Sequence, residues 1–60
     1  MLEQLIGMEK QEAITFIRSS GMSVRIAQEE GVTNNLAGDY DSNRVNIVIK
    51  NGRIFSFTQG

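Results

Sequence analysis

Two acids and an arginine lie close together in the second half of the chain, where Asp39, Tyr40 and Asp41 are followed by Arg44. Paired carboxylates are typical of an acid dyad or a cation site, but a calcium loop needs more oxygen ligands at regular spacing. Acids in loops more often form turns. The spacing therefore predicts no metal site, and favours a charge-assisted contact from Arg44 to Asp39 or Asp41.

Three arginines provide a second kind of candidate site. Arg25, Arg44 and Arg53 lie on or beside stretches that alternate like strands, and together they could bind an anion, with Asn43 contacting a base edge. One chain of 60 residues offers little concave surface, so such a pocket would form between the subunits of a homo-oligomer. A small anionic ligand such as a signalling nucleotide stays open.

The composition excludes several function classes. The chain has no cysteine or histidine, so zinc sites of thiolate and imidazole, cysteine nucleophiles and Ser-His triads are ruled out. Six basic and seven acidic residues give a net charge of -1, without a basic stripe for duplex nucleic acid. We expect a protein that is not an enzyme and that uses no cofactor.

Length and N-terminal sequence predict where the chain works and how it is organised. Residues 1–6 carry neither a basic region nor a long apolar run, so we expect no signal peptide, no membrane span and a cytoplasmic protein. Residues 1–60 are expected to form a single domain. A core this small supports about 3 to 5 kcal/mol of stability, which favours a homo-oligomer.

Hydropathy patterns predict the elements that must position these residues. Apolar residues repeat at three and four over residues 9–20, which predicts an amphipathic helix closed by Gly21 in a left-handed conformation. Strict alternation predicts strands over residues 22–27 and 44–50.

A hairpin is predicted at the end of the chain. The Asn-Gly pair at 51–52 is typical of a type I′ turn, in which both residues take positive φ. Its second arm, residues 53–58, is expected to place Phe55 and Phe57 on one face and Ile54 on the other.

Residues 28–43 are polar and show no periodicity. A structureless segment this long is uncommon in a small domain and is usually functional. The chain is therefore predicted to have an α+β fold, with one helix packed on a small mixed β-sheet and a long exposed loop at about 28–43.

Three short motifs stand in a fixed order: Leu-Ile-Gly at 5–7 before the helix, Asp-Tyr-x-x-x-Arg-Val-Asn at 39–46 before a strand, and Asn-Gly-Arg-Ile at 51–54. This order resembles the potato inhibitor I family of serine protease inhibitors, especially its short bacterial relatives, over nearly the whole chain. The resemblance implies a helix on a small sheet and an exposed loop that a protease grips as if it were substrate. Such a loop is cut slowly because it is held rigid.

The resemblance also implies a role for each loop residue. Gly38 matches the specificity position before the scissile bond, and Asp39 matches the acid that follows it. Arg44 matches the arginine that hydrogen-bonds this acid, and Asn46 stands where many members carry a second supporting arginine. The implied binding loop comprises Ala37, Gly38, Asp39, Tyr40 and Asp41. The expected function is loop-mediated inhibition of a serine protease, with the anionic-ligand alternative of Arg25, Arg44, Arg53 and Asn43 kept open.

Overall fold

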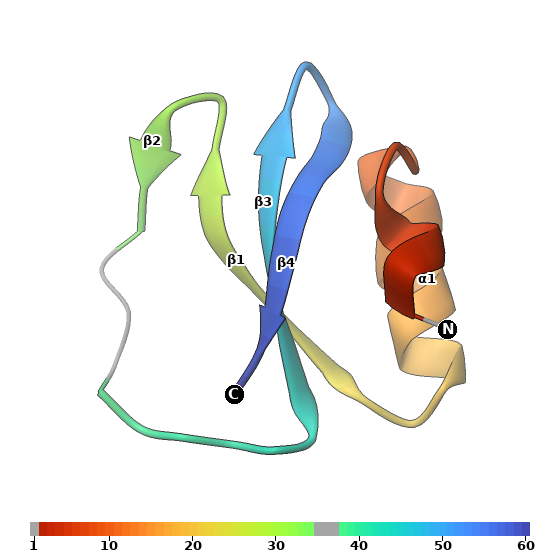
Figure 1. Cartoon of the computed structure of the whole chain (residues 1–60), viewed down its shortest axis with the longest axis vertical. Coiled ribbons are helices and arrows are strands. Elements are labelled where there is room, and N and C mark those ends of the chain that lie inside the picture. The colour runs from red at the N-terminus through yellow and green to blue at the C-terminus, as the bar shows by residue number, and fades with distance from the viewer. Residues whose placement is uncertain (1, 35–37) are drawn as a thin grey trace.

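The computed structural model describes residues 2–34 and 38–60. Its elements are η1 (Leu2–Leu5), α1 (Lys10–Ser19), β1 (Ser23–Glu29), β2 (Val32–Thr33), β3 (Arg44–Lys50) and β4 (Arg53–Gln59). The four strands form one sheet in the order β2-β1-β3-β4, with α1 lying beside it (Figure 1). Because β1 and β3 are parallel and the other pairs antiparallel, the sheet is mixed. The predicted α+β arrangement is confirmed.

The core lies between the helix and the sheet. It consists of apolar side chains that are almost fully buried: Leu5, Ala13, Ile17, Val45, Ile47, Ile49 and Ile54. Each large apolar side chain buried here is worth about 1.5 to 3 kcal/mol. Gly21 has φ +82 and follows the helix as expected. Within residues 2–34 and 38–60, no helix is long and apolar enough to cross a membrane.

A β-bulge in β4 changes which side chains face the core. Ile54 pairs with Ile49, but the next pair is Ser56 with Val48, so Phe55 is an extra residue. A bulge shifts the alternation of every residue beyond it. Ile54 and Phe57 consequently both pack on the core, whereas Phe55 is 60% exposed. The prediction that Phe55 and Phe57 share a face is wrong.

The first part of the expected loop is instead a second hairpin. β1 continues to Glu29, which pairs with Val32 across a two-residue turn. Glu30 and Gly31 have φ values of +51 and +83, and positive φ at both positions is what a type I′ turn requires. The loop therefore begins at residue 34, and its expected start at residue 28 is wrong. Glu-Gly is a rarer pair for this turn than Asn-Gly, which explains why the sequence pattern missed it.

Candidate functional site

The candidate site lies at the end of the sheet where the parallel strands β1 and β3 begin. Arg25 on β1 is the register partner of Asn46 on β3. Alternation along β3 turns Val45 and Ile47 towards the core, so Arg44 and Asn46 lie on the opposite face. The segment before β3 passes this end of the sheet, and the end of β4 lies near it (Figure 1).

The carboxylate of Asp39 is held by two arginines on the neighbouring strands β1 and β3. Arg44 Nη1 lies 3.2 Å from Asp39 Oδ2, and Arg25 Nη1 lies 3.4 Å from Asp39 Oδ1. Arg44 also donates through Nη2 to the main-chain oxygen of Asp39 at 3.1 Å. The hydrogen bond from Arg44 is the main cause that lowers the pKa of Asp39, so this carboxyl is ionised at neutral pH. Its side chain is 58% exposed, whereas that of Arg44 is only 13% exposed.

Arg44 also ties the loop to the end of β4. Its Nε and Nη2 donate to the main-chain oxygen of Gly60 at 3.2 and 3.0 Å. The main-chain N–H of Gly60 in turn donates to the oxygen of Arg44 at 3.0 Å. One guanidinium therefore joins the loop to the last strand. Gly60 belongs to none of the sites predicted from the sequence, because only folding brings it next to Arg44.

Arg25 provides the second supporting guanidinium, which the family resemblance places at position 46, where this chain has Asn46. Arg25 Nε donates to Asn46 Oδ1 at 2.9 Å, while its Nη1 reaches Asp39. Asn46 Nδ2 lies 3.4 Å from both Thr58 Oγ1 and the oxygen of Gly60. Asn46 thus supports the loop by orienting Arg25 and the end of β4. This arrangement depends on the parallel register of β1 and β3, which the alternation in the sequence does not predict.

The other loop residues that the structure describes are exposed, and Asp41 forms a local turn among them. Gly38, Tyr40 and Asp41 are exposed, whereas Ala37 lies outside the described residues. Asp41 Oδ1 accepts the main-chain N–H of Asn43 at 2.9 Å, and the oxygen of Asp41 accepts the N–H of Arg44 at 3.1 Å. Asp41 is therefore a turn residue rather than one half of a carboxylate pair.

The structure brings together only two of the three arginines considered for an anionic ligand. Arg25 and Arg44 meet at Asp39. Arg53 pairs with Lys50 beside the hairpin turn, and its Nη1 donates to the oxygen of Gly7 at 2.9 Å. The Nδ2 of Asn43 donates to the oxygen of Gly21. Within one chain the three arginines do not meet, because Arg44 and Arg53 lie at opposite ends of the β3–β4 pair.

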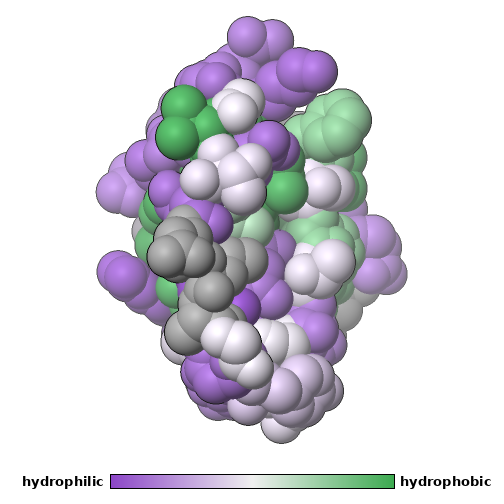
Figure 2. Space-filling view, turned by 90° about the vertical axis from the view of Figure 1, so that its left-hand side faces the viewer, coloured by the Kyte–Doolittle hydropathy of each residue, from purple (hydrophilic) through white to green (hydrophobic). Residues whose placement is uncertain are grey.

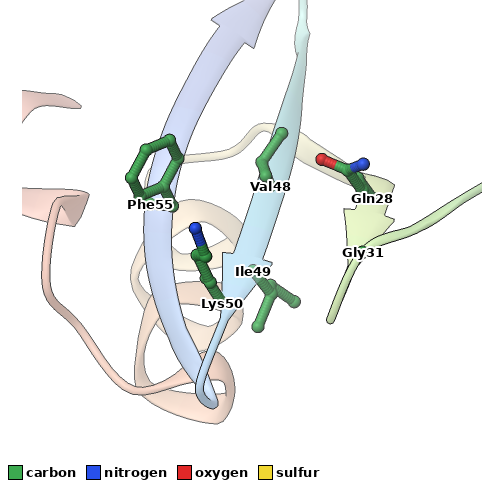
Figure 3. Close-up of a pocket in the computed structure, with 6 residues that line it drawn as sticks. All are labelled: Gln28, Gly31, Val48, Ile49, Lys50 and Phe55. Carbon is green, nitrogen blue, oxygen red and sulfur yellow. The ribbon is translucent and has the colours of Figure 1, made fainter.

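A hollow of about 190 Å³ lies towards the other end of the sheet. The residues that line it are Gln28, Gly31, Val48, Ile49, Lys50 and Phe55 (Figure 3). Lys50 Nζ stands 5.2 Å from the centre of the Phe55 ring. The hollow is smaller than most ligand pockets. Seen from the β2 side, hydrophobic atoms form separate patches in the upper and middle parts of the molecule, and the lower end is mostly of intermediate hydropathy (Figure 2).

Comparison of the chain with protein-family models, curated proteins and solved structures finds no match. What the site offers is an exposed segment whose acid is fixed by two shielded guanidinium groups. This arrangement can hold the segment around Asp39 in one conformation.

Proposed function

We propose that this chain is a non-catalytic binding protein that inhibits a serine protease through the loop around Gly38, Asp39 and Tyr40. The observation that carries the proposal is the linkage from Asp39 through Arg44 to Gly60. A loop fixed in this way loses little conformational entropy on binding. If a protease cut the Gly38–Asp39 bond, the new amine of Asp39 would stay in place. It could attack the ester that Gly38 forms with the catalytic serine, which re-forms the peptide bond and releases the serine. A cytoplasmic site of action is part of the proposal.

Gly38 allows a direct test of this proposal. It is exposed, and a Cβ added to it would meet nothing within 4 Å. A larger side chain at this position is therefore compatible with the fold. Because glycine leaves the specificity pocket of a protease empty, we expect the natural chain to inhibit weakly and Gly38→Phe to inhibit much better.

The experiment measures the inhibition constant of the natural chain and of Gly38→Phe against subtilisin and chymotrypsin. We expect the substitution to lower the constant by about 100-fold, since filling an apolar anchor pocket is worth about 2 to 3 kcal/mol. Gln11→Phe, on the exposed surface of α1, is the matched control and should change nothing. Absence of inhibition by both the natural chain and Gly38→Phe, with unchanged circular dichroism, would overturn the proposal.

The anionic-ligand alternative has less support. Arg25 and Arg44 already donate to Asp39, Asn46 and Gly60, and Arg53 is distant from them. This alternative needs a homo-oligomer, which stays a prediction that light scattering can check. If the protease test fails, a thermal-shift screen of nucleotides is the measurement that would favour it, since a bound ligand raises the melting temperature by mass action.

A further inference from the structure

Tyr40 combines high exposure with a defined seat. Its side chain is 77% exposed. Nevertheless, a Cβ added to Gly60 would lie 3.0 Å from Tyr40 Cε2 and 3.2 Å from Cδ2. Gly60 also has φ +146, a conformation that other residues rarely adopt. The tyrosine ring therefore lies so close to Gly60 that a Cβ at this position would displace it by a few tenths of an ångström.

The main chain on both sides of Tyr40 is also held. Arg44 Nη2 donates to the oxygen of Asp39 before it, and the N–H of Arg44 donates to the oxygen of Asp41 after it. Gln59 Nε2 reaches the oxygen of Ser42 at 2.7 Å. An aromatic side chain on such a backbone loses little freedom when a partner covers it.

Tyr40 is also the only large exposed hydrophobic side chain that the structure describes in the loop. The others are Ile6, Val32 and Phe55, which lie on other segments. Tyrosine is enriched among the residues that dominate binding energy at interfaces, whereas Gly38 offers no side chain. Among the described loop residues, Tyr40 is therefore the one candidate anchor, and it is the second residue after the expected scissile bond.

We infer that Tyr40 is the anchoring side chain of the loop and that Gly60 is the seat that fixes its ring. The partner is then a serine protease with an apolar pocket for the second residue after the scissile bond. This inference depends on the proposed function, but it assigns the affinity to the opposite side of the bond from the specificity position.

The test measures inhibition constants against the protease most strongly inhibited among subtilisin, chymotrypsin, elastase and trypsin. Tyr40→Ala should weaken inhibition by about 30-fold or more, as expected for a dominant interface residue. Tyr40→Phe should stay within about threefold, because it keeps the ring. Phe55→Ala removes another exposed aromatic ring and serves as the matched control, with no expected change.

Gly60→Ala should displace the ring without removing it, and we expect a loss of about tenfold. Tyr40 is the only tyrosine, and there is no tryptophan, so fluorescence anisotropy decay reports on this ring alone. Fast local rotation should appear in Gly60→Ala and be absent from the natural chain.

Each other outcome overturns something specific. Inhibition that persists in Tyr40→Ala within about threefold, or a ring that rotates freely in the natural chain, would overturn the anchor and leave the proposed function standing. Failure of both the natural chain and Gly38→Phe to inhibit any of the four proteases would overturn the proposed function and the anchor together.

Discussion

Carboxylates are held at both ends of the sheet, but by different kinds of donor. At the hairpin end, Glu30 Oε1 accepts the main-chain N–H of Asn51 and Oε2 accepts that of Gly52, both at 2.8 Å. At the loop end, the carboxylate of Asp39 is contacted by guanidinium groups of Arg44 and Arg25 at 3.2 and 3.4 Å. One acid is therefore fixed by the main chain and the other by long side chains.

The contact of Glu30 therefore has a structural role in the hairpin, whereas the contacts of Asp39 hold the loop in position. Asn51 and Gly52 have φ values of +55 and +74 and form a tight turn, so the hairpin itself fixes the two N–H groups that the side chain of Glu30 accepts. Glu30 also donates its own N–H to the oxygen of Ile49 at 2.9 Å. Arginine side chains can instead be removed while the strands stay paired. The hairpin end should therefore contribute to global stability, and the loop end to local order.

Arg44→Ala should have the largest effect on local order. It removes the hydrogen bonds to Asp39 and Gly60, and a hydrogen bond from a shielded charged donor to a main-chain oxygen is worth about 1.5 to 3 kcal/mol. We expect amide hydrogen exchange at Asn43 and Gly60 to accelerate by about tenfold or more, while the core amides of β3 change less. Unchanged exchange at Asn43 and Gly60 would contradict the role given to Arg44.

Glu30→Gln should show the opposite pattern. Removing the negative charge weakens two hydrogen bonds to the hairpin turn, so the melting temperature should fall by a few degrees. Exchange at Asn43 and Gly60 should change no more than the global stability does. Glu12→Gln, an exposed substitution in the first turn of α1, is the control and should lower the melting temperature less, because it loses only a favourable interaction with the helix dipole. Selective loosening of the loop in Glu30→Gln would remove the distinction between the two ends.

Acid should affect both ends, with different readouts. The N–H groups of Asn51 and Gly52 lower the pKa of Glu30, and the hydrogen bond from Arg44 lowers the pKa of Asp39. A lowered pKa in the folded state adds stability above the ordinary values of 4.5 and 3.8, and this contribution is lost as the pH falls through the lowered values. Melting temperature should therefore depend less on pH below these values in Glu30→Gln. Amide exchange in the loop should likewise depend less on pH in Asp39→Asn. The same pH dependence in the natural and the substituted chains would contradict this prediction.

Arg25→Ala should have the smallest effect of the four substitutions. The others are Arg44→Ala, Glu30→Gln and Asp39→Asn. The contact of Arg25 with Asp39 is the longer one, and Asp39 remains bonded to Arg44. Because the carboxylate of Asp39 is largely exposed and ion pairs of this kind contribute little, we expect loop exchange to increase by about threefold at most. Arg25→Lys, which keeps the charge but not the planar guanidinium, shows whether the contact with Asn46 matters. An effect of Arg25→Ala larger than that of Arg44→Ala would reverse the order of the two supports.

The regular elements could be predicted from the sequence because their signals are local. The apolar repeat gave the helix to within one residue at each end, and alternation gave residues 44–50 as the strand that the structure shows. The bulge at Phe55 was missed because regular alternation, with Phe55 and Phe57 on one face, fits the apolar pattern as well as a bulge does. β2 was missed because its two residues are both exposed and carry no alternation.

The site was only partly predictable for a related reason. The contact of Arg44 with Asp39 joins residues five apart, and the spacing was enough to suggest it. The contributions of Arg25 and Gly60 depend on a parallel register and on the end of β4, which are properties of the fold. Sequence spacing therefore found the short-range support and missed the supports that lie far away along the chain.

The most direct measurement follows cleavage of the bond between positions 38 and 39 by mass spectrometry. The Gly38→Phe chain and the same chain with Arg44→Ala are each incubated with subtilisin. The first should inhibit and stay largely intact, while the second should be cut at this bond at least about tenfold faster, because its loop is no longer held. Equal cleavage rates in the two chains, or a cut at another bond, would contradict the claim that the support by Arg44 makes this loop an inhibitor.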